Sequence, residues 1–94
     1  MLVNIKYDML PPHMQAGARL YVEQGVEQGD FLTAVLSNDL VKACSRADEI
    51  NIHEITSWAS WLYNEAPAAC WGSIGKVKAW INHRGIQGLQ EGMI

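Results

Sequence analysis

The chain divides into apolar stretches with helical spacing, separated by short breaks that contain Gly, Pro or Asp. Pro11-Pro12 open the first stretch and Gly25 follows it, and Pro suits the first turn of a helix whereas Gly often ends one. Its apolar residues recur every three or four positions: Met14, Ala18, Tyr21 and Val22. This pattern predicts a helix between Pro12 and Gly25. We expect the mixed residues before it, 1–10, to form an extended arm.

A second stretch begins at Gly29-Asp30, where Asp30 is the expected N-cap. Its apolar residues lie within about 80° of one another on a helical wheel; they are Leu32, Leu36, Leu40, Ala43 and Ala47. Asp39 falls at the edge of this stripe. Either a cation such as Arg46 pairs with Asp39 in a continuous helix, or the helix breaks at residues 37–39 and Asp39 caps a second segment. Ser, Asn and Asp all compete for backbone hydrogen bonds, which favours the break.

Two further helices follow. Asn51 with Glu54 three residues later resembles a capping box at the start of a third helix, and Pro67 ends it. Ser73 is the expected cap of a fourth helix, which Gly85 ends. The sequence therefore predicts an all-α fold, a compact single-domain bundle of four to five short helices over residues 1–85 with an extended N-terminal arm. The last stretch, 86–94, is rich in Gly and is expected to be a flexible tail.

Composition and charge narrow the classes of function. The chain has 94 residues, of which 49% are hydrophobic, and four are Trp, so the core needs neither a disulfide nor a structural metal. The net charge is −3, and residues 23–65 hold eight acids against Lys42 and Arg46. This argues against direct binding to nucleic acid, which rests on Lys and Arg. No apolar run is long enough to span a membrane and no secretory signal is visible, so we expect no membrane partner and a cytoplasmic location.

The strongest candidate surface lies on the third helix. Its apolar stripe is centred near Ile55, and the residues at i, i+4, i+7 and i+11 on another face are Glu54, Trp58, Trp61 and Glu65. Trp is frequent among the energetically dominant residues of protein interfaces, so this face is predicted to bind a partner. Asp39 and Asp48 are expected to add charge to it. The alternative is that the fourth helix or the N-terminal arm covers Trp61.

The sequence offers little for catalysis. The three His and two Cys have no spacing that would place two of them on one metal ion, so we expect no metal and no cofactor. Cys70 precedes the expected helix start at Ser73, a position that can activate a thiol. Its Ala-Ala-Cys-Trp context favours a packed thiol, and spacing identifies no base. We therefore expect that the protein is not an enzyme.

Three blocks of sequence carry a resemblance: GDFLTAVLSNDL at 29–40, RAD at 46–48 and WLYNEAPAACWGS at 61–73, with Val77 and Trp80. Together, over residues 7–82, they resemble a family of small proteins from phages and prophages. The resemblance implies a phage accessory protein and brings no catalytic residues with it. Such proteins are similar in style to inhibitors of host defence, of which anti-CRISPR proteins are the best known.

Two main hypotheses follow, beside a minor one of an enzyme or small-ligand pocket around Cys70 and a His. The first is stoichiometric binding to a host protein or protein complex in the cytoplasm of the infected cell, with inhibition of host defence as its most specific form. The second is a self-associating structural or accessory protein whose Trp face closes a homodimer.

Overall fold

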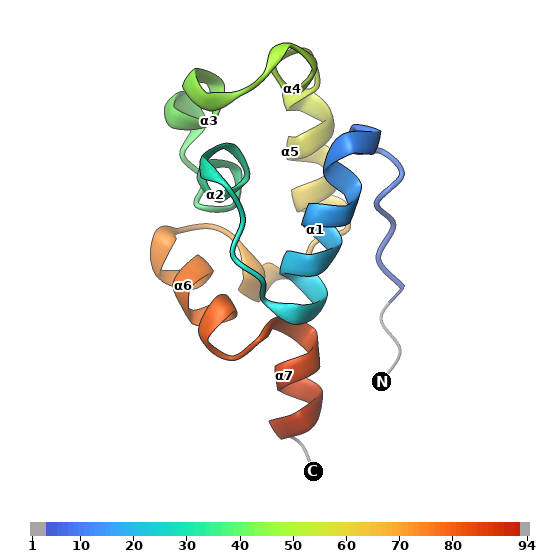
Figure 1. The fold of residues 1–94 in the computed structure, drawn as a ribbon, viewed down its shortest axis with the longest axis vertical. Helices are drawn as coiled ribbons and strands as arrows, with labels where there is room; N and C mark the ends of the chain where they lie inside the picture. The colour runs from blue at the N-terminus through green and yellow to red at the C-terminus, as the bar shows by residue number, and fades with distance from the viewer. Residues whose placement is uncertain (1–3, 93–94) are drawn as a thin grey trace.

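The computed structural model describes residues 4–92, with side chains as far as Leu89 (Figure 1). Seven α-helices and one 3-10 turn make up this part of the chain, which contains no strand. They are α1 (Pro12–Gln24), α2 (Asp30–Leu36), α3 (Leu40–Arg46), α4 (Glu49–His53), α5 (Ile55–Asn64), η1 (Ala68–Cys70), α6 (Ile74–Asn82) and α7 (Gly85–Gly92). The all-α prediction is confirmed, whereas the expected four to five helices are too few.

One reason for the larger number is the break between α2 and α3. Asn38 has a φ of 62°, a left-handed conformation that an α-helix cannot contain. The Asp39 carboxylate then accepts a hydrogen bond from the Lys42 backbone N–H at 3.1 Å. Asp39 thus caps a second segment, the alternative that the sequence favoured. Arg46 lies beside Asp30 instead, at 3.8 Å.

Two expected caps are wrong. The N-cap of α2 is Gly29, and Asp30 is the first helical residue with no capping hydrogen bond from its side chain. Asn51 does not cap the helix that carries the two Trp residues. It lies inside the separate helix α4, whose cap is Asp48, and Glu54 marks the turn between α4 and α5. Ser73 does cap α6 as predicted, accepting from the Lys76 N–H.

The core is built from one face each of α1, α2, α5 and α6, with three indoles at its centre. Each indole N–H has an acceptor: Trp58 donates to the Asn51 side chain, Trp61 to the Lys6 carbonyl and Trp80 to the Tyr21 carbonyl. A buried indole needs such a partner because an unpaired donor is costly away from water. Two of these bonds join residues more than fifty positions apart.

The N-terminal segment is packed against the body of the molecule. Its residues from 4 onwards are not helical, as expected of an arm, but Tyr7 and Leu10 are buried. The Lys6 N–H donates to the Glu65 carboxylate at 3.0 Å. Residues 1–3 of the predicted arm lie outside the described residues. The segment therefore acts as a cover over α5.

At the other end, the residues expected to form a tail contain a helix as far as residue 92. Residues 85–92 form α7, which packs against α1, and residues 93–94 lie outside the described part. The contact depends on Gly25 and Gly85, both with positive φ, where the two backbones touch. The described chain measures 43 × 25 × 19 Å, with α3 and α4 at one end of its long axis and α7 at the other (Figure 1).

Candidate functional site

The aromatic face predicted on α5 is not a surface. Trp58 is 1% exposed and Trp61 is fully buried. Their rings meet edge to face, with centroids 6.1 Å apart, and Tyr7 of the N-terminal segment packs on Trp61. The prediction that these rings form an exposed face is therefore wrong, and the alternative of cover by the N-terminal segment is correct for Trp61. The error came from centring the buried stripe on Ile55, which is only partly buried.

The carboxylates assigned to that face have local structural partners. Glu65 accepts from the Lys6 N–H, and Glu54 accepts from the Ser57 hydroxyl at 2.7 Å. Asp39 and Asp48 each cap a helix. Each of the four acids therefore already accepts a hydrogen bond within the fold.

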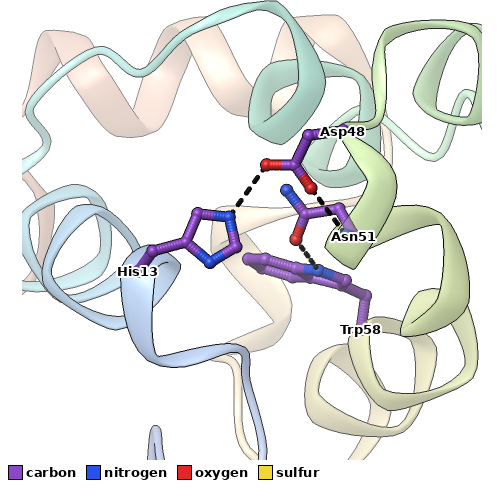
Figure 2. A network of polar contacts seen from close by, with 4 residues as sticks. All are labelled: His13, Asp48, Asn51 and Trp58. Atoms are coloured by element: carbon purple, nitrogen blue, oxygen red, sulfur yellow. Dashed lines mark hydrogen bonds and ion pairs between the residues drawn. The ribbon is translucent and has the colours of Figure 1, made fainter.

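Asp48 belongs to a polar network that sequence reasoning missed (Figure 2). Its carboxylate lies 2.9 Å from His13 Nε2 of α1 and accepts from the Asn51 N–H at 2.7 Å. Asn51 in turn accepts from the Trp58 indole at 3.2 Å. The network therefore ties α1 to α4 and α4 to α5. Only the 48–51 spacing was visible in the sequence, because His13 lies 35 positions before Asp48.

These contacts shift the acidity of Asp48. The Asn51 N–H, and then His13, hold the pKa of this carboxyl below its usual value. A carboxyl with a lowered folded-state pKa contributes stability at neutral pH, and that contribution is lost as the pH falls through the folded-state pKa. Both His13 and Asp48 are exposed, and the contact between them joins α1 to the start of α4.

The candidate nucleophile has no reactive character. Cys70 is fully buried, and burial raises the pKa of its thiol to about 12. A protonated, buried thiol is a poor nucleophile. The other thiol, Cys44 on α3, is exposed and free. Among the described residues, no group of three His, Cys, Asp or Glu side chains is placed to hold a metal ion.

The most unusual surface lies on α3 and α4. Within residues 40–53, all of them described, only Ala43 and Asn51 are buried. The same segment exposes four large apolar side chains: Leu40, Val41, Ile50 and Ile52. Leu40 is 64% exposed and Val41 80%. An ordinary amphipathic helix turns such residues inward, so this segment is unusually apolar on its outer side.

A hollow of about 90 Å³ opens beneath α3. Its lining comes from α2, the break after it, α3 and α5: Val35, Asn38, Asp39, Leu40, Ala43, Ile55, Trp58, Ala59 and Leu62. The four α5 residues follow i, i+3, i+4, i+7 spacing and so form one helix face. Leu40 is both a lining residue and strongly exposed. The hollow and the outer apolar residues of α3 thus meet at Leu40, and we call them together the α3–α5 surface.

Asn51 is expected to hold the edge of this surface in place. Asn51→Ala leaves the Trp58 indole without an acceptor, and an unpaired buried donor costs about 1–3 kcal/mol. The free energy of unfolding, measured by urea titration, should fall by that amount. Asn64→Ala is the control, since Asn64 is exposed and bonds only within its own helix; it should change stability by less than about 0.5 kcal/mol. Equal effects of the two changes would contradict the assigned role.

No helix in the described part of the chain is long and apolar enough to cross a membrane. Comparisons with models of protein families, with curated proteins and with solved structures give no match. The α3–α5 surface therefore has to be interpreted from its own geometry.

Proposed function

We propose that this protein acts without catalysis, by stoichiometric binding of another protein at the α3–α5 surface. One observation carries the proposal: Leu40 lines an apolar hollow and remains 64% exposed, with Val41 beside it at 80%. Exposed apolar side chains that adjoin a hollow are typical of binding surfaces, whereas single scattered ones are not. This surface replaces the Trp58–Trp61 face as the binding site.

The dimensions of the hollow favour a protein partner over a small substrate. Pockets for small molecules usually measure about 300–1,000 Å³, and this hollow is near 90 Å³. Its two polar lining residues are Asn38 and Asp39, and the Asp39 carboxylate is already used as a helix cap. A side chain from a partner fits such a space better than a substrate does.

The biological setting in this proposal comes from the resemblance of residues 7–82 to small phage and prophage proteins. It places the binding in the cytoplasm of an infected cell, with a host protein or complex as partner. Inhibition of host defence, in the manner of anti-CRISPR proteins, is the most specific form of the proposal.

A charge placed on Leu40 should weaken binding at least tenfold. Leu40→Asp puts a carboxylate where an apolar partner group would sit, and loss of an interface anchor weakens binding at least tenfold, or about 1.4 kcal/mol. Tagged wild-type protein and the variant would be compared by quantitative affinity capture from bacterial lysate. Leu20→Asp, at an exposed position of α1 outside the hollow, is the matched control and should retain the partner. Equal retention by both variants would assign binding to another surface.

The second candidate function is self-association, which the same exposed Leu40 and Val41 favour. In that case a second copy covers the α3–α5 surface. Sedimentation at micromolar concentration would then give a dimer for the wild type and a monomer for Leu40→Asp. A monomeric wild type removes this candidate.

A further inference from the structure

We infer that the partner at the α3–α5 surface presents an amphipathic helix with Lys or Arg beside its apolar face. The inference rests on the proposed binding function and adds the chemistry of the partner. Three observations support it. They are the shape of the hollow, the lack of an unpaired strand edge in residues 4–92, and the charge of the segment around the hollow.

The shape favours a helix. Ile55 and Leu62 mark the ends of the α5 lining, and seven residues of helix span about 10 Å. That is two helical turns, the length over which a bound helix places anchors at i, i+3 or i+4, and i+7. Strand addition is the other common mode of peptide binding, and it needs an unpaired strand edge. Residues 4–92 offer none, since every regular element there is helical.

The charge favours a basic partner. Residues 47–75 contain four acids and neither Lys nor Arg. Two of the acids, Glu49 and Glu54, lie at the start of α4 and immediately before α5, and Asp39 lines the hollow itself. The cations nearest in sequence are Lys42 and Arg46 on α3, and Arg46 already lies beside Asp30. Residues 39–54 as a whole hold four acids against these two cations, so the segment around the hollow carries a net negative charge. Complementary charge on a partner strengthens and orients docking.

Two of the buried indoles, those of Trp58 and Trp80, allow occupation of the hollow to be measured by NMR. Trp58 lines the hollow, and its N–H is held by Asn51. Trp80 is buried elsewhere and donates to the Tyr21 carbonyl. Occupation of the hollow should therefore shift the indole N–H resonance of Trp58 in a two-dimensional NMR spectrum and leave that of Trp80 unchanged.

The probes are three designed peptides of about 18 residues, long enough to be helical. They share one Leu and Ala face and differ only in its flanks, which are Lys and Arg, Gln, or Glu. The peptide with Lys and Arg should shift the Trp58 resonance and bind at least tenfold more tightly than the other two. The preference should shrink at about 0.5 M salt, because salt screens exposed charges. The double variant Glu49→Gln, Glu54→Gln should reduce the preference, whereas Glu27→Gln, in the loop before α2, should not.

The outcomes separate this inference from the binding function. If all three peptides bind equally, the surface binds helices but the basic partner is wrong. If none binds, the helical partner is wrong, while the capture experiment with Leu40→Asp still decides whether the surface binds a protein. A Trp58 shift that depends on protein concentration without peptide would overturn the inference in favour of a second copy.

Discussion

Trp61→Ala should lower the free energy of unfolding by about 3–5 kcal/mol, the range observed when a large aromatic is removed from a core. Trp61 is fully buried, touches Trp58 and Tyr7, and holds the N-terminal segment through its bond to the Lys6 carbonyl. The change leaves a cavity where α5 meets the N-terminal segment. Because small domains are stable by only about 5–15 kcal/mol, this loss is a large fraction of the total stability.

Urea denaturation followed by circular dichroism would measure this loss. Tyr63→Ala is the control, since Tyr63 is an aromatic residue two positions away on the same helix and is 84% exposed. It should cost less than about 0.5 kcal/mol. A Trp61→Ala protein as stable as Tyr63→Ala would mean that the ring is not in the core.

Gly85→Ala should be comparably harmful, for a different reason. Gly85 has a φ of 65°, and an added Cβ would lie 2.6 Å from the Gly25 nitrogen and 2.7 Å from the Val22 carbonyl oxygen. The left-handed conformation alone costs a residue with a side chain about 1 kcal/mol or more. The overlap adds to this, because both neighbouring atoms belong to the backbone and cannot rotate away. We expect a total loss of about 3 kcal/mol or more, in the range of severe single substitutions.

The matched control is Gly29→Ala. Gly29 has a φ of −71°, and no atom lies within 4 Å of an added Cβ. That substitution should cost no more than about 1 kcal/mol in thermal denaturation, because Ala is a weaker N-cap than Gly while it also restricts the unfolded chain. If Gly85→Ala melts at the same temperature as Gly29→Ala, the contact between α1 and α7 is not as described.

Several local signals in the sequence predicted the structure correctly, although the caps expected at Asp30 and Asn51 were wrong. Asp39 and Ser73 each bond a backbone N–H three positions later, so their identity and spacing suffice to predict a helix start. The left-handed Gly25 at the end of α1 is of the same kind. These features need no knowledge of the rest of the fold.

Features set by distant contacts were not predictable in the same way. The N-terminal segment, more than fifty positions from Trp61, determines which face of α5 is covered. The glycines of residues 85–92 disfavour a helix by local propensity, but packing against α1 overrides that preference. The network through His13 likewise joins residues that no sequence pattern connects.

The candidate site moved for a related reason. The sequence pattern indicates a site at the Trp residues of α5, whereas the exposed apolar residues of the proposed surface are Leu40 and Val41 on α3. The sequence did contain a signal for their exposure. If Asp39 caps a helix, Leu40 and Val41 occupy the first turn of that helix, and Ala43 is the residue on its inward face. The helical spacing instead assigns Leu40 to one continuous apolar stripe, which predicts a buried side chain.

The long bond from Trp80 to α1 also bears on how the chain acquires its structure during synthesis. Tyr21 and Val22 obtain this indole as a neighbour only after nearly sixty further residues have been made. Until then one side of α1 stays uncovered. Closing so long a loop costs conformational entropy, which the contacts of Trp80 alone do not offset before the rest of the core assembles. The core around α1 should therefore be completed late in folding, once the segment that carries Trp80 has been made.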